Sequence, residues 1–338
     1  MRGLGWNVVL LLAASLPASA DPSYPDYAPA SGCKGELHSV GSDMMDTVML
    51  AWLERFRELH PQVEATLEAR SAASACPALV DGRGQLAPIS RDFTAAETAA
   101  FQRKFGYPPA RIRVTCGTYS TPGLSPPVVL FVNRANPLDS VTLEQVAEIY
   151  AENGTLRTWG QLGLAGEWAG QAIHPWSLRS PNGTAAYFQG AALRGRPFRS
   201  DLTVRPAADN LSRSDQRTAS GGVQAFVDLL AGVAADRSAI GYAAPGYSTT
   251  GLKALALAPA PGVPPVTASR ANVAALRYPL CRFTFIYLNR PPGRPLDRNV
   301  REFLLLVLSR EGQDLVERRS GFLRLPPQIC AQERARLE

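Results

Sequence analysis

Chemistry in this chain is concentrated in short polar turns at the starts of helices. The turn at residues 180–184 (Ser-Pro-Asn-Gly-Thr) follows an apolar run and precedes a segment with the residue types of a helix. The first amides of a helix have no partner within it, and they carry the positive end of the helix dipole. Such a turn can bind an anion through its backbone N–H groups. Because Asn182 is also a good helix cap, a turn of this kind is, in isolation, more often an ordinary cap.

Two further turns have the same character. The segment 41–43 (Gly-Ser-Asp) joins a predicted strand at 35–40 to a helix whose apolar stripe begins at Met45. The segment 71–74 (Ser-Ala-Ala-Ser) follows a predicted strand at 63–68 and precedes another helical segment. Ligands of α/β folds bind at the carboxyl ends of strands, where helices begin. We therefore expect the three turns to meet at one anion site.

Two arginines accompany these turns. Arg91 follows Ser90 at the end of a predicted strand, and Arg179 precedes the turn at 180–184. A guanidinium can hold an oxyanion through two parallel hydrogen bonds, and we favour Arg91 for this role over Arg179. Asp43 would accept the proton of a protonated oxyanion, which would favour phosphate over sulfate. The predicted anion-binding residues are Ser42, Asp43, Met44, Ser71, Ser74, Ser90, Arg91, Arg179, Asn182, Gly183 and Thr184.

Catalytic and metal-binding signatures are missing from the sequence. The three histidines, His38, His60 and His174, lie far apart and lack the spacing of metal ligands. The chain contains no nucleophile elbow, no phosphate-binding P-loop and no zinc-protease motif. A phosphatase would need a nucleophile and a base, and no such pair is evident. We therefore predict a binding protein rather than an enzyme, with no cofactor and no metal.

The net charge indicates the kind of partner, and the N-terminus indicates the compartment in which the protein acts. The formal net charge is +6 with a pI near 9.2, and the arginines are scattered rather than grouped with aromatic residues. This distribution excludes nucleic acid as the expected partner and is compatible with a small anion. Residues 1–20 combine Arg2, an apolar run and a small-residue end at Ala20, which is the pattern of a secretory signal peptide. We therefore expect export to the periplasm or beyond, with cleavage near Ala20.

Five cysteines make an odd number for an oxidising compartment. Cys281 and Cys330 bracket the last predicted strand and the C-terminal helix, so we expect them to form a disulfide. Cys33 with Cys116 is a second candidate pair. Cys76 would then remain a buried free thiol.

Predicted strands alternate with predicted helices along the whole chain. Two sequences have the pattern of a capping box that starts a helix, one beginning at Thr94 and one at Thr142. A Pro- and Gly-rich loop at 119–127 separates two predicted strands, and we place a crossing between two lobes there. The alternation predicts an α/β protein with mainly parallel sheets.

Several short stretches together resemble the periplasmic phosphate-binding proteins of ABC importers, which have the type II periplasmic-binding-protein fold. The resemblance covers nearly all of the chain after residue 20, and it implies two lobes joined by a hinge. Lobe 1 would contain 33–125 and 275–338, and lobe 2 would contain 126–274. The expected partners are phosphate or a related oxyanion and a membrane ABC permease, with the protein a monomer. The matching stretches are Gly41-Ser42-Asp43-Met44-Met45, Pro77-Ala78-Leu79, Ile89-Ser90-Arg91, Asn136-Pro137-Leu138, Thr158-Trp159-Gly160-Gln161-Leu162-Gly163, Asn182-Gly183-Thr184, Ala239-Ile240-Gly241-Tyr242 and Tyr278-Pro279-Leu280.

The turns that would hold the ligand depart from the family pattern. Hydroxyl residues of the family are replaced in the first two turns, and each lost hydrogen bond to a charged ligand costs roughly 1 to 3 kcal/mol. An alternative function therefore stays open: a degenerate binding protein that acts as a sensor or interaction subunit without transport. The departures are Asp43 and Met44 in place of threonine, Ala72 and Ala73 in place of serine, Asn182 in place of serine, and Leu178 at the position of the family's arginine, one residue before Arg179.

Overall fold

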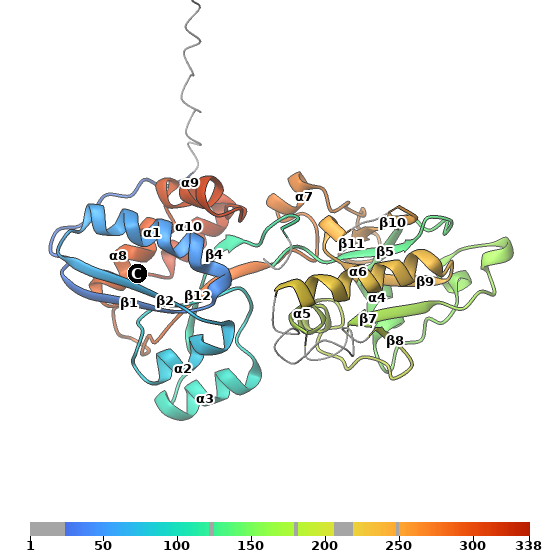
Figure 1. Cartoon of the computed structure of the whole chain (residues 1–338), viewed down its shortest axis with the longest axis horizontal. Helices are drawn as coiled ribbons and strands as arrows, with labels where there is room; N and C mark the ends of the chain where they lie inside the picture. The colour runs from blue at the N-terminus through green and yellow to red at the C-terminus, as the bar shows by residue number, and fades with distance from the viewer. Residues whose placement is uncertain (1–23, 122–124, 179–181, 206–218, 248–249) are drawn as a thin grey trace, which may run out of the picture.

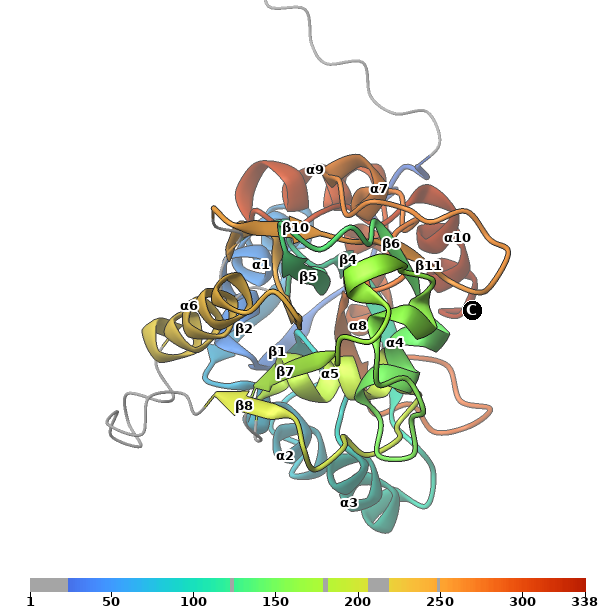
Figure 2. The same ribbon diagram turned by 90° about the vertical axis from the view of Figure 1, so that its right-hand side faces the viewer.

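The computed structural model describes residues 24–121, 125–178, 182–205, 219–247 and 250–338. Figures 1 and 2 show two groups of elements, one built from the first and last parts of the described chain and the other from its middle. Lobe 1 contains β1 (Gly35–Gly41), α1 (Asp46–Leu59), β2 (Val63–Ala69), α2 (Ala75–Val80), β3 (Ala87–Ile89), α3 (Ala95–Phe105), β4 (Ala110–Cys116), β12 (Phe283–Leu288), α8 (Arg298–Val307), α9 (Arg310–Arg319) and α10 (Pro327–Ala335). Lobe 2 contains β5 (Val129–Asn133), β6 (Ser140–Thr142), α4 (Leu143–Tyr150), β7 (His174–Leu178), α5 (Gly183–Ala191), β8 (Thr203–Arg205), α6 (Ala219–Ala235), β9 (Ala239–Ala243), β10 (Leu252–Ala254), β11 (Ala256–Ala258) and α7 (Arg270–Ala274).

The sheets combine parallel and antiparallel pairs. In lobe 1, β1 pairs in parallel with β2, and β12 lies between β3 and β4, antiparallel to both. In lobe 2 the strand order is β10-β5-β9-β7-β8, with β7 parallel to both of its neighbours and β5 antiparallel to both of its own. The predicted α/β class with two lobes is confirmed. The sheets are more mixed than we expected, because β12 runs opposite to β3 and β4 in lobe 1 and β5 runs opposite to β9 and β10 in lobe 2.

Helix α1 shows how the apolar pattern builds the core of lobe 1. Its predicted stripe is buried, and α1 packs on β2, α8 and α9. The Trp52 indole N–H donates to the Gly312 carbonyl oxygen at 2.8 Å, which ties α1 to α9. Burying each large apolar side chain stabilises the fold by about 1.5–3 kcal/mol. The buried residues of the stripe are Met45, Val48, Met49, Trp52, Leu53 and Phe56.

Both predicted capping boxes are present. Thr94 and Glu97 bond reciprocally at the start of α3, and Thr142 and Gln145 do so at the start of α4. The first box also matters for the site, because Glu97 lies next to Arg91.

The predicted disulfides are not formed. All five cysteines carry free thiols in the structure, including Cys281, Cys330, Cys33 and Cys116. The Cys281 sulfur lies 3.6 Å from the carbonyl oxygen of Val273 at the end of α7, and Cys330 is buried within lobe 1 on α10. Burial raises the pKa of the Cys116 thiol, and both of these thiols are near enough to raise it further, but none of the three is bonded to another.

Candidate functional site

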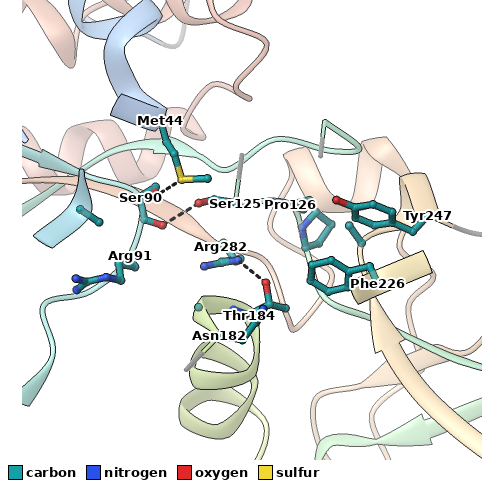
Figure 3. Close-up of a pocket in the computed structure, with 14 residues that line it drawn as sticks. Met44, Ser90, Arg91, Ser125, Pro126, Asn182, Thr184, Phe226, Tyr247 and Arg282 are labelled. Carbon is teal, nitrogen blue, oxygen red and sulfur yellow. Dashed lines mark hydrogen bonds between the residues drawn. The ribbon is translucent and has the colours of Figure 1, made fainter. Parts of the chain in front are cut away.

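A cavity of about 270 Å³ lies between the lobes. Figure 3 shows residues from both lobes and from the connecting segment converging on it. The lining residues are Met44, Ala72, Ser90, Arg91, Ser125, Pro126, Pro127, Asn182, Gly183, Thr184, Phe226, Ala244, Tyr247 and Arg282. Six residues of the predicted anion site, Met44, Ser90, Arg91, Asn182, Gly183 and Thr184, are among them.

Two buried serines form the lobe 1 side of the cavity. Ser90 follows β3, and its hydroxyl lies 3.3 Å from the Met44 sulfur, a weak acceptor. Ser125, in the segment that leads to β5, donates its hydroxyl to the Ser90 carbonyl oxygen at 2.8 Å. Ser125 has a backbone φ of +43°, an uncommon conformation for a residue other than glycine. Non-glycine residues in this region cluster at functional sites, where the surrounding structure holds them.

The start of α5 forms the lobe 2 side of the cavity. We expected its first amides to be free, but two of them are hydrogen-bonded within the protein. The Asn182 side-chain oxygen accepts from the amides of Thr184 (2.9 Å) and Ala185 (3.1 Å). Asn182 therefore acts as the strong N-cap that its residue type allows. The amide of Met44 is capped in the same way, by the Ser42 hydroxyl and the Asp43 carboxylate. Attraction for an anion must come mainly from side chains in this conformation.

The predicted arginine, Arg91, is paired with a carboxylate. Its guanidinium forms two hydrogen bonds with Glu97, of 2.7 and 2.9 Å, and Figure 3 shows it directed away from the centre of the cavity. Burial acts to raise the pKa of Glu97, but the hydrogen bonds from Arg91 and Thr94 and the charge of Arg91 together outweigh it and hold that pKa below its usual value. The charge of Arg91 is therefore largely compensated.

A second arginine, Arg282, was missed by the sequence analysis. It precedes β12 and lies in the cavity with its guanidinium directed at Thr184, whose hydroxyl oxygen is 3.5 Å from Nη1 (Figure 3). Its guanidinium carbon is 4.9 Å from the centre of the Tyr187 ring. Among the described residues no carboxylate lies within ion-pair distance of Arg282. Burial lowers its pKa, yet a guanidinium stays charged.

The sequence does contain a signal for Arg282. No Asp or Glu occurs between Asp236 and Asp297, so a positive charge in this stretch has no nearby partner along the chain. An arginine there, immediately before an apolar strand, is a candidate for binding an external anion.

The other predicted residues lie outside the cavity lining. Ser42 is buried and caps the turn before α1, while Asp43 is exposed to solvent. Ser74 donates its hydroxyl to the Ser71 carbonyl oxygen at 2.7 Å, so it is engaged with the backbone. In this turn Ala72 faces the cavity instead. Arg179, together with residues 180 and 181 of the turn, lies outside the described residues.

Neither a metal site nor a membrane span is found in the part of the chain that the structure describes. No group of three or more His, Cys, Asp or Glu residues there is placed to hold a metal ion. None of the helices described is long and apolar enough to cross a bilayer. The arrangement as a whole is a water-accessible cavity with hydroxyls and one uncompensated guanidinium, which is suited to binding an anion.

Comparisons with known proteins agree with this chemistry. The model of the PBP superfamily domain matches residues 27–311. The phosphate-binding protein PstS of Pseudomonas aeruginosa is 33% identical over 324 residues, which covers 94% of this chain and 92% of that protein. Protein SphX of Synechococcus elongatus is 25% identical over 322 residues, covering 94% and 85%.

Solved structures support the fold. PstS from Borrelia burgdorferi matches with a TM-score of 0.56 at 18% identity, covering 87% of this chain and all of that one. An ABC-type phosphate transport receptor from Vibrio cholerae matches with a TM-score of 0.53 at 19% identity, covering 86% of this chain. The model match over most of the chain and the 33% identity to PstS together settle the family. The chain belongs to the PBP superfamily and, within it, to the family of the phosphate-binding protein PstS.

Proposed function

We propose that this protein is the solute-binding component of an ABC importer and that it captures phosphate or a related oxyanion in the cavity between its lobes. The observation that carries the proposal is Arg282, a partly buried guanidinium with no carboxylate within ion-pair distance among the described residues. A charge removed from water without a counter-charge is costly, and an anion in the cavity would compensate it. The PstS relatives supply the identity of the anion and of the membrane partner.

The roles of the lining residues follow from their positions. Arg282 would hold the anion through charge, and the hydroxyls of Thr184 and Ser90 would donate to it. The Gly183 amide lies at the same helix start, where the macrodipole favours negative charge. Arg91 would contribute a weaker, longer-range attraction because Glu97 offsets its charge. Hinge closure of the two lobes would then bury the anion.

Localisation and organisation belong to the same proposal. Residues 1–20 would be a leader that directs export, and the exported protein would act as a monomer without nucleic acid. The lobe boundaries would be 33–125 with 275–338, and 126–274. The passage of the chain between the lobes after β4 and again before β12 supports this division.

Isothermal titration calorimetry with phosphate, arsenate and sulfate tests the proposal. Phosphate should bind, and Arg282→Ala should weaken it by about tenfold to a hundredfold, since a hydrogen bond to a charged group is worth roughly 1.5–3 kcal/mol. The matched control is Arg277→Ala, an exposed arginine five residues earlier that does not line the cavity. Equal losses in both variants would show that general charge, not the site, attracts the anion.

A second candidate function is favoured by the capped helix starts. With the amides of Met44, Thr184 and Ala185 engaged by side chains, affinity for a bare oxyanion is reduced relative to an open cradle. If none of the three anions binds to the folded protein, the interaction-subunit alternative replaces the transport proposal.

A further inference from the structure

The cavity has two chemically different sides. Figure 3 shows Ser90, Thr184 and Arg282 on one side, and Pro126, Phe226 and Tyr247 on the other. Pro127 and Ala244 also line the cavity; Pro127 follows Pro126 in the chain, and the Ala244 carbonyl oxygen accepts from the Tyr247 amide. One half of the cavity therefore offers charge and hydroxyls, and the other half offers a continuous apolar surface, which we call the aromatic wall: Pro126, Pro127, Phe226, Ala244 and Tyr247.

The aromatic wall is well ordered by its own contacts. The Phe226 and Tyr247 rings are stacked, with centres 4.9 Å apart and an interplanar angle of 18°. Tyr247 belongs to a short turn after β9, and its amide donates to the Ala244 carbonyl oxygen at 3.2 Å. Stacked aromatic side chains lose little conformational freedom when a ligand binds, so the wall is preorganised for a flat apolar group.

Tyr247 carries an unused hydrogen-bond donor. Its side chain is buried, with only 8% of the residue exposed, and Figure 3 shows its hydroxyl directed into the cavity. Within the described residues this hydroxyl has no hydrogen-bond partner. Burial raises the pKa of Tyr247, so the phenol is a neutral donor. Because this hydroxyl faces the cavity and is not engaged by the part of the protein that the structure describes, it is available to an acceptor on a ligand bound there.

A bare oxyanion has no apolar surface to match the aromatic wall. Phosphate has five non-hydrogen atoms, and none of them is carbon. An anion held at Arg282 and Thr184 would leave the aromatic wall in contact with water. Apolar surface that faces a ligand site favours a ligand with apolar surface of its own.

We infer, building on the proposed function, that the cavity takes an organophosphorus anion: a phosphoryl dianion with one uncharged apolar substituent. The phosphoryl oxygens lie at Arg282 and Thr184, and the substituent packs against Phe226 and Tyr247. The Tyr247 hydroxyl donates to an oxygen of the same ligand. A phosphonate and a phosphate monoester share this chemistry and differ only in a bridging oxygen.

Calorimetry on the chain without residues 1–20 tests the inference with four probes: inorganic phosphate, methylphosphonate, phenylphosphonate and phenyl phosphate. We expect phenylphosphonate to bind at least about tenfold more tightly than methylphosphonate, a difference of about 1.4 kcal/mol. A preference for phenyl phosphate over phenylphosphonate would assign the monoester, and the reverse would assign the phosphonate. Either order supports the inference, provided that the phenyl group strengthens binding.

Variants assign the preference to the aromatic wall. Phe226→Ala should bring the affinity ratio of phenylphosphonate to methylphosphonate close to one, and Phe226→Leu, which keeps an apolar side chain, should retain part of it. Val227→Ala, at an exposed neighbouring position on α6, should leave the ratio unchanged. Tyr247→Phe should weaken the phenyl ligands severalfold. Thermal unfolding of each variant shows whether it is folded.

The outcomes separate this inference from the proposed function. If phosphate binds and the phenyl probes bind no better than methylphosphonate, the inference is wrong and the proposed function stands. A phenyl preference that persists in folded Phe226→Ala would also overturn it. If the phenyl probes bind and phosphate does not, the inference stands and the function shifts to organophosphorus uptake. If no probe binds, both are wrong.

Discussion

The guanidinium carbon of Arg282 lies 4.9 Å from the centre of the Tyr187 ring, so the start of β12 in lobe 1 is stacked on helix α5 of lobe 2. The Tyr187 hydroxyl also donates to the Cys281 carbonyl oxygen at 2.5 Å. These two contacts fix the direction of the Arg282 side chain. We therefore expect Tyr187 to act as a positioning residue for Arg282.

Replacement of Tyr187 should reveal this role. Tyr187→Leu removes the ring that Arg282 stacks on, and we expect phosphate affinity to fall about twofold to thirtyfold, since such a stack is worth about 0.5–2 kcal/mol. Tyr187→Phe keeps the ring and should retain most of the affinity. Calorimetry measures both. A loss in Tyr187→Phe as large as in Tyr187→Leu would assign the effect to the hydroxyl instead.

The Arg91–Glu97 pair offers a way to increase anion binding. Glu97→Gln removes the carboxylate charge while keeping a residue that a capping box accepts at this position. We expect the freed charge of Arg91 to tighten phosphate binding by about twofold to tenfold and to make it more sensitive to salt. Titrations at low and high KCl measure this. Glu144→Gln, on the exposed first turn of α4, is the control, and an equal gain there would exclude a local effect.

Gly117 holds the connecting segment in place. A Cβ atom at this position would overlap the carbonyl oxygen of Ser125, whose hydroxyl is bonded to Ser90 in the cavity. Gly117→Ala should therefore displace Ser125 and lower the free energy of unfolding by about 1–3 kcal/mol, with weaker phosphate binding. Gly170→Ala, where a Cβ would meet open space, should do neither. Urea unfolding and calorimetry compare the two, and an unaffected Gly117→Ala would contradict the close packing.

From the environment of His60 we predict that the free energy of unfolding decreases in acid. It is buried, and its Nε2 lies 2.7 Å from the hydroxyl of Tyr27, which in turn contacts Glu302. Burial lowers the pKa of His60, against an opposing effect of the Glu302 charge. The unfolded state therefore binds the proton more readily, so this contribution to stability is present above about pH 6.5, the usual histidine value, and is lost below it.

Urea unfolding at several pH values between 7.5 and 5 measures that loss. His60→Gln should unfold more easily at pH 7.5 but lose less of its stability as the pH falls. His174→Gln, at an exposed position, is the comparison variant. If His60→Gln and the unmodified protein lose stability in parallel, another group causes the acid sensitivity.

The fold could be predicted from the sequence because its local signals are strong. The stripe from Met45 to Phe56, the two capping boxes and the proline after α1 each specify an element without reference to the rest of the chain. The direction of β12 could not be read in this way. Strand pairing across 169 residues, as between Thr115 and Thr284, leaves no local pattern.

The sequence predicted where the site lies better than it predicted which groups are free to bind a ligand. The turns at Ser90 and Asn182 do meet at the cavity, because strand ends gather there. Whether an amide or a guanidinium is free depends on its partners in three dimensions. The Asn182 side chain accepts a hydrogen bond from its own helix, and Arg91 forms an ion pair with Glu97, six residues away. Arg282 was overlooked because no turn marks it, although the absence of nearby acidic residues is visible in the sequence.

The central position of β12 in its sheet also determines the order in which the sheets can form during synthesis. Every strand of lobe 2 has been synthesised by residue 258, whereas the β3-β12-β4 sheet of lobe 1 requires residues 283–288. The middle of the polypeptide can therefore fold first, while the strand edges of β3 and β4 that pair with β12 remain unpaired. Chaperones that bind extended apolar segments would have the most time to bind these early strands, and a ribosome stalled before β12 would release a chain that lacks the β3-β12-β4 sheet.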